Sequence, residues 1–124
     1  MGTMIARLWH GWTRRSNADA YESLLRGEIL PGIHRLAGHR GAMLLRRDAG
    51  EQVEFVTLTL FDSMEAVRAF AGEDAEAAVV PPDARRLLER FDQRSVHYEL
   101  VVPVMRVNRP GIAGEGPPRT GDGR

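Results

Sequence analysis

The hydrophobic pattern along the chain predicts strands that alternate with helices. Apolar, β-branched and aromatic residues cluster in four segments that are typical of strands, namely 4–13, 39–47, 53–61 and 95–107. A turn at 48–50 separates the second segment from the third, so these two form a hairpin.

Helical spacing of apolar residues fills the intervals between these strands. Ser16 with Asp19 three residues later resembles a capping box, and the apolar stripe that follows is broken at Pro31. Ser63 opens a second helix in the same way. Asp83 is expected to cap a short extra helix, which carries Leu87, Leu88 and Phe91, before the last strand.

The order β-α-β-β-α-β predicts an α+β fold of the ferredoxin-like kind, an antiparallel sheet with its helices on one face. The strand at 53–61 is apolar on both faces, with Val53, Phe55 and Phe61 on one and Val56, Leu58 and Leu60 on the other. Because the helices cover only one face, we expect a second copy of the chain to cover the other, which makes a homodimer. Pro103 cannot donate to a sheet ladder, so its strand is expected at an edge.

Composition narrows the class of protein. With 124 residues, of which 43% are hydrophobic, the chain suits one domain, which we place at 1–107 and follow with a flexible Gly- and Pro-rich tail at 108–124. The 17 basic and 17 acidic residues balance, so we expect no nucleic-acid partner. No apolar run is long enough for a membrane helix and no signal peptide opens the chain, so a cytoplasmic protein is expected. The absence of Cys and Lys excludes thiolate and Schiff-base catalysis.

Three segments resemble the antibiotic biosynthesis monooxygenase family of dimeric α+β barrel proteins: Met4-Ile5-Ala6-Arg7-Leu8-Trp9-His10-Gly11, residues 36–47 and residues 60–70. The likeness spans roughly residues 4–102. It implies a ferredoxin-like protomer, a homodimer whose two sheets form a barrel, and a pocket between each sheet and its helices.

The same resemblance implies two kinds of activity. Some members are cofactor-independent oxygenases of polycyclic aromatic anthrones, and their Asn, Trp, Tyr and Arg set cannot be placed here residue by residue. Others degrade haem with an Asn, a Trp and a His, whose positions fall by ungapped matching on Leu8, Phe70 and Val80. None of these three residue types is retained, so haem degradation is disfavoured and no cofactor is expected.

Two histidines are the candidate catalytic residues. His10 shares parity with Leu8 and Trp12, which the resemblance places toward the pocket, and a histidine can take a proton from an acidic carbon or a phenol. The alternative is a core histidine bonded to backbone, with Gly11 marking a bulge or a close approach. His97 could lie beside His10 across the sheet and share a proton with it. Two histidines are a weak metal signal, so no metal is expected.

Four residues are candidates for substrate binding. Trp12 could stack on a planar ligand on the His10 face, in which case Trp9, of opposite parity, suits the dimer interface. Tyr98 is an alternative interface residue, and Arg40, close to His34 and His39, could steer an anionic or phenolic ligand to the pocket mouth. Core packing for the tryptophans and a solvated loop charge for Arg40 are the structural alternatives.

Three functions remain open from the sequence. The first is a cofactor-independent monooxygenase of a small aromatic or enolisable substrate. The second is a non-catalytic ligand-binding or stress-associated dimer on the same fold. The third is an isomerase that uses His10 as its base.

Overall fold

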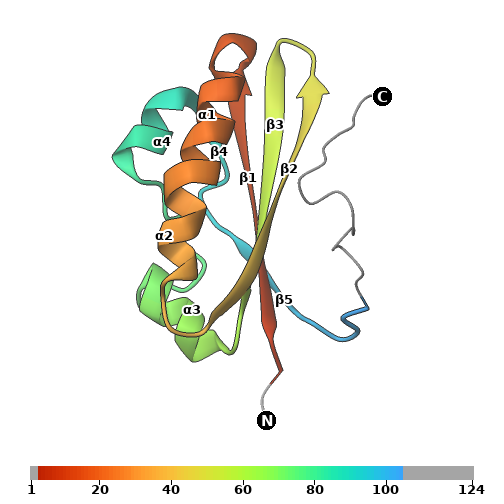
Figure 1. Ribbon diagram of the computed structural model, residues 1–124, viewed down its shortest axis with the longest axis vertical. Helices are drawn as coiled ribbons and strands as arrows, with labels where there is room; N and C mark the ends of the chain where they lie inside the picture. The colour runs from red at the N-terminus through yellow and green to blue at the C-terminus, as the bar shows by residue number, and fades with distance from the viewer. Residues whose placement is uncertain (1–2, 105–124) are drawn as a thin grey trace, which may run out of the picture.

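The computed structural model describes residues 3–104 and confirms the α+β architecture. Its strands and helices follow in the order β1 (Ile5–Arg14), α1 (Ala18–Leu24), α2 (Leu30–His34), β2 (His39–Ala49), β3 (Gln52–Phe61), α3 (Met64–Ala71), α4 (Pro82–Leu87), β4 (Leu88–Phe91) and β5 (Val96–Glu99). The strands form one antiparallel sheet in the order β2-β3-β1-β4, and β5 also pairs with β1. Figure 1 shows the helices gathered on one side of this sheet.

The fourth strand position is shared by two short strands, which differs from the single strand predicted at 95–107. β4 pairs with Gly11–Thr13, and β5 pairs with Ile5–Leu8 further along β1. The helix predicted to reach Phe91 ends at Leu87, and it begins at Pro82 without a capping bond from Asp83. β5 ends at Glu99, so Pro103 lies beyond the strand in which it was expected. The predicted tail at 108–124 lies outside the described residues.

The first helical segment continues through Pro31, which was predicted to break it. A wider π-helical turn at Leu25–Ile29 joins α1 to α2, and the N–H of Leu30 bonds to the carbonyl of Leu25 five residues back. Because Pro31 has no N–H to donate four residues back, this wider turn lets the helix pass the proline. The predicted Ser16 cap is wrong, since a 3-10 turn at Arg15–Asn17 precedes α1. The Ser63 cap is confirmed, because its hydroxyl accepts the Ala66 N–H at 3.2 Å.

Alternate residues of β1 face opposite sides of the sheet. Ile5, Gly11 and Thr13 are buried on the side that packs against the helices, opposite Phe61, Phe55 and Val53 of β3. Two clusters form this core, one around Tyr21 and Phe55 and one around Phe61 and Val67. The other side of the sheet carries no helix of the described chain (Figure 1). No helix among residues 3–104 has the length and apolar character needed to cross a bilayer.

Substitution by alanine should have opposite effects on stability at two glycines, one within the first helical segment and one after it. Gly38 has a φ of +87°, and a Cβ there would lie 2.6 Å from the Cβ of Ala66 in α3. Gly38→Ala is therefore expected to cost about 2–3 kcal/mol of unfolding free energy. Nothing lies within 4 Å of a Cβ at Gly27, so Gly27→Ala should add about 0.5–1 kcal/mol. Urea denaturation measures both, and equal effects would contradict the assigned backbone geometry.

Candidate functional site

A cavity lies between the sheet and the helices. The space between its wall atoms measures about 530 Å³ when the open solvent at its mouth is included, and the cavity proper measures about 60 Å³. Aliphatic side chains of the first helical segment and of the loop before α4 form much of its wall, and three aromatic residues, Trp9, Tyr21 and Phe70, also line it. This lining suits a flat apolar ligand.

The aromatic walls are held by neighbouring elements. The indole N–H of Trp9 donates to the carbonyl of Asp92 at 2.8 Å, which fixes the ring beside the junction of β4 and β5. Tyr21 is 1% exposed and packs against Phe55 at 4.7 Å between ring centroids. Burial raises the pKa of the Tyr21 phenol well above its usual range, so the hydroxyl stays protonated at neutral pH.

A buried cation lies at the polar side of this cavity. Arg7 is 4% exposed, and its guanidinium donates to the carbonyls of Ala75 at 2.5 Å and Ala77 at 2.8 Å. It also lies 5.4 Å from the centre of the Phe70 ring. In the described part of the chain no carboxylate forms an ion pair with Arg7, although most other arginines here have one. The positive charge of the cavity is therefore not neutralised by a described acidic side chain.

His97 lies directly beside Arg7 in the sheet. The two residues are register partners of β5 and β1, and a guanidinium nitrogen of Arg7 lies 2.9 Å from Nε2 of His97. Burial, together with the positive charge of Arg7, lowers the pKa of His97. The imidazole is therefore neutral at pH 7, and its Nε2 accepts from Arg7 rather than from a ligand.

Two hydroxyls of the cavity have no hydrogen-bond partner within residues 3–104. The Oγ1 of Thr57 and the Oγ of Ser95 are buried and unpaired, and both residues line the cavity. Thr57 faces Trp9 across the β1–β3 ladder, and Ser95 directly precedes β5. A buried hydroxyl without a partner is costly, so such groups call for an explanation, and a ligand can supply the missing partner.

His10 lies on the other face of the sheet, so the expectation that it faces the cavity is wrong. The lining includes Arg7 and Trp9, which alternate with Leu8 and His10 along β1. The Nδ1 of His10 lies 3.0 Å from a carboxylate oxygen of Asp92, and its Nε2 lies 3.8 Å from Glu54. The predicted pairing of His10 with His97 is also wrong, because His97 is in register with Arg7 on the helix side.

The two tryptophans exchange the places that were predicted for them. Trp9 lines the cavity, whereas Trp12 lies on the open face, stacked on His10 and covered by the Arg90 guanidinium at 3.8 Å. Gly11 between them is a close approach, as one of the alternatives proposed, since a Cβ there would lie 3.0 Å from Leu88. The alternation of side chains along β1 correctly predicted that the two indoles lie on opposite faces of the sheet. The face predicted for each indole was the wrong one.

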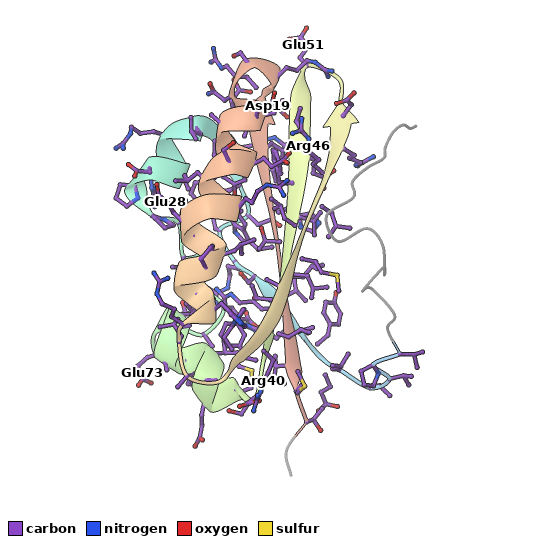
Figure 2. The ribbon with its side chains drawn as sticks, in the orientation of Figure 1. Asp19, Glu28, Arg40, Arg46, Glu51 and Glu73 are labelled. Atoms are coloured by element: carbon purple, nitrogen blue, oxygen red, sulfur yellow. The ribbon has the colours of Figure 1, made fainter. Side chains whose placement is uncertain are left out.

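Tyr98 and Arg40 lie away from the cavity. Tyr98 is in register with Ala6 on the open face and is 55% exposed. Arg40 is exposed and its Nε donates to Asp62 at 2.5 Å. Figure 2 shows Arg40 at the end of β2 that lies near α3, far along the strand from Arg46. Neither residue is positioned to contact a ligand in the cavity.

A second hollow opens between the first helical segment and β2, where a pocket mouth was expected. His34 and His39 both line it, and their Nδ1 atoms lie 2.9 Å apart. Burial, together with neighbouring His34, lowers the pKa of His39. No group of three or more His, Cys, Asp or Glu side chains gathers around a possible metal position within residues 3–104.

The sequence patterns missed Arg7, Thr57 and Ser95. Arg7 shares parity with Ile5 and Trp9, and Thr57 shares parity with Val53 and Phe55, so both belong to a face that is otherwise apolar except for Thr13 and Thr59. A charged residue and a hydroxyl residue at positions of two adjacent strands that are expected to face the helices form a pattern from which Arg7 and Thr57 could have been predicted. Ser95 gives no such signal, because it stands between the two short strands.

Searches against protein-family models and curated proteins give no match. Solved structures match over most of the chain. A Chloroflexus aurantiacus protein assigned to the antibiotic biosynthesis monooxygenases is 15% identical with a TM-score of 0.59, over 83% of this chain and 98% of that one. A cofactor-independent oxygenase of Streptomyces nogalater is 14% identical with a TM-score of 0.52, over 86% and 100%.

A haem-degrading protein of Mycobacterium tuberculosis, solved with two haems in its active site, is 19% identical with a TM-score of 0.53, over 82% of this chain and 99% of that one. The chain therefore has the fold of the antibiotic biosynthesis monooxygenases, as its resemblance to them implies. Of the positions matched to haem degraders, Phe70 and Val80 line the cavity, whereas Leu8 points to the open face. No described lining residue is a histidine that could ligate haem iron.

Proposed function

We propose that this chain, which has the fold of the antibiotic biosynthesis monooxygenases, is a cofactor-independent monooxygenase of a small aromatic or enolisable substrate. The observation that carries the proposal is the cavity with Trp9, Tyr21 and Phe70 in its lining and the cation of Arg7 at its polar side. The cofactor-independent oxygenase among the structures of the same fold supports it.

In such a reaction the substrate itself supplies the electrons that reduce dioxygen. A methylene group between carbonyl-bearing rings reacts with one O₂ to give a carbonyl group and one water. One oxygen atom enters the product and the other leaves in water, so no external reductant is needed. The protein contributes by excluding solvent, orienting the ring and favouring the deprotonated substrate that reacts with oxygen.

The cavity lining of the described chain includes no His, Asp or Glu to serve as a general base. This observation favours a second candidate function, a non-catalytic small-ligand-binding protein. It also separates the site from an isomerase that uses His10, because His10 lies on the opposite face of the sheet. An oxygenase built on this cavity must therefore take a substrate that ionises readily.

Oxygen uptake by the purified protein distinguishes the two candidates. With a panel of hydroxyanthrones and quinols, we expect at least one compound to consume one O₂ per product molecule, faster than the same compound without protein. Binding of panel compounds without oxygen uptake by any of them would instead support the non-catalytic ligand-binding protein.

We further propose that the oxygenase is a homodimer built on the open face of the sheet. On this face Met43, Leu45, Val96 and Tyr98 are each at least 40% exposed, and they lie beside the less exposed Leu58 in the central strand. Contiguous apolar surface of this kind marks an interface in most proteins. A second copy of the sheet, packed face to face, would cover it.

Leu45→Arg is expected to convert this dimer to a monomer at micromolar concentration. Leu45 is 51% exposed on the open face, and in a twofold dimer the substitution places two unpaired charges in the apolar interface. Leu36→Arg, at a residue that is 43% exposed after α2, is the matched control and should remain a dimer. Sedimentation velocity measures both, and a wild-type chain that sediments as a monomer would overturn the proposed dimer.

A further inference from the structure

Arg7 differs from the other described arginines because it is buried and faces neutral partners. Its hydrogen bonds go to two carbonyls and to a neutral imidazole, and together they use three of the five N–H donors of a guanidinium. Burial of a cation without an ion pair costs free energy. A bound anion that pairs with the guanidinium would offset this cost.

Polar groups surround Arg7 on the floor of the cavity. Thr59 and His97 flank Arg7 directly in the sheet, and Thr57 is a diagonal neighbour, one pair further along β3. Together with Ser95, the two threonines bring hydroxyl groups to the same cavity as the guanidinium. The hydroxyls of Thr57 and Ser95 are buried without a hydrogen-bond partner among the described residues.

The aromatic wall limits the kind of anion that the cavity can take. Phe70 lies against the guanidinium, and Trp9 follows Arg7 on the same face of β1. A hydrated inorganic anion would leave these apolar surfaces uncovered, whereas a planar ring that carries an ionised oxygen would cover them and reach Arg7.

We propose that the cavity binds an aromatic oxyanion, a planar ring system whose phenolate, enolate or carboxylate oxygen contacts Arg7 and accepts from the hydroxyls of Thr57 and Ser95. This inference rests on the proposed function and names its substrate class. It also accounts for the lack of a general base in the lining, since a cation that binds the anion tightly lowers the pKa of the bound acid. His97 positions Arg7 by accepting one of its N–H groups.

Calorimetric titration with a matched pair of probes tests the proposal. 2-Naphthoate and 2-naphthamide have the same rings and differ in charge, so their ratio of affinities isolates the ionised oxygen. At pH 7 the full chain should bind 2-naphthoate at least about tenfold more tightly than 2-naphthamide. Equal affinities would overturn the proposal, whereas preference for the anion without oxygen uptake in the panel would uphold it and count against the oxygenase.

Substitution of Arg7 distinguishes an anion site from a structural clamp. Arg7→Gln should remove the preference for 2-naphthoate and leave 2-naphthamide binding within about threefold of wild type. Arg40→Gln, which removes an exposed arginine outside the cavity, should leave both affinities unchanged. Equal losses for the two probes in Arg7→Gln would show a purely structural role and overturn the proposal.

The unpaired hydroxyls give a test that does not depend on the folding of an Arg7 variant. Thr57→Val combined with Ser95→Ala should weaken 2-naphthoate about tenfold while it raises the melting temperature by about 2–6 °C, because two unsatisfied buried groups disappear. Stability gained together with affinity lost is the signature of groups retained for binding. A double variant that binds 2-naphthoate as tightly as wild type would overturn the assigned contacts.

Discussion

Val79→Trp is expected to abolish ligand binding in the helix-side cavity while the protein stays folded. Val79 lines the cavity and is 40% exposed, so it stands at the mouth, where a larger side chain can block entry without disturbing the core. An aromatic ligand that buries about 150–250 Å² gains about 4–6 kcal/mol at 25 cal/mol per Å². Losing this contribution weakens binding by about 1,000-fold or more.

Val79→Ala is the control for this substitution, because it widens the mouth and should leave affinity within about threefold of wild type. Titration calorimetry with 2-naphthoate measures binding, and circular dichroism confirms the fold of each variant. Wild-type affinity in Val79→Trp would show that the ligand enters or binds elsewhere.

Phe55→Ala is expected to lower the free energy of unfolding by about 3–5 kcal/mol. Phe55 is fully buried and packs against Tyr21, so it holds α1 to the centre of the sheet. The loss is a large part of the roughly 5–15 kcal/mol of stability that a domain has. Because Tyr21 also lines the cavity, the same substitution should weaken ligand binding.

Urea denaturation measures the effect of Phe55→Ala, and Leu36→Ala at an exposed position is the control, with an expected change within about 0.5 kcal/mol. A loss below about 1 kcal/mol at Phe55 would mean that the helix is held to the sheet by other contacts.

The element order and the hairpin could be predicted from the sequence because they depend on local patterns. The residues from Val53 to Phe61 alternate between two apolar faces. The hydroxyl of Ser63 caps its helix by accepting the N–H of Ala66, three residues later. The split of the last strand was not predictable in this way. Leu87, Leu88 and Phe91 have helical spacing, yet Leu88–Phe91 pairs with β1, because partners distant in sequence decide between helix and strand.

The sequence placed the candidate site on the side of β1 away from the cavity, because parity divides a strand into two faces without saying which face the helices cover. Both faces of β1 carry a tryptophan and a basic residue, so hydrophobicity alone gives no preference. Arg7 is buried on the helix side because the carbonyls of Ala75 and Ala77, about seventy residues away in sequence, accept its N–H groups. A contact of that range leaves no periodic signal near Arg7.

The two tryptophan indoles report most directly on whether the ligand site is the helix-side cavity. Trp9 lines the cavity and Trp12 lies on the open face, so a ¹H–¹⁵N spectrum of the protein contains one indole signal from each side of the sheet, assigned with Trp12→Phe. On titration with 2-naphthoate we expect the Trp9 signal to shift to saturation while the Trp12 signal stays in place. A shift of the Trp12 signal alone would place the ligand on the His10 face and contradict the account.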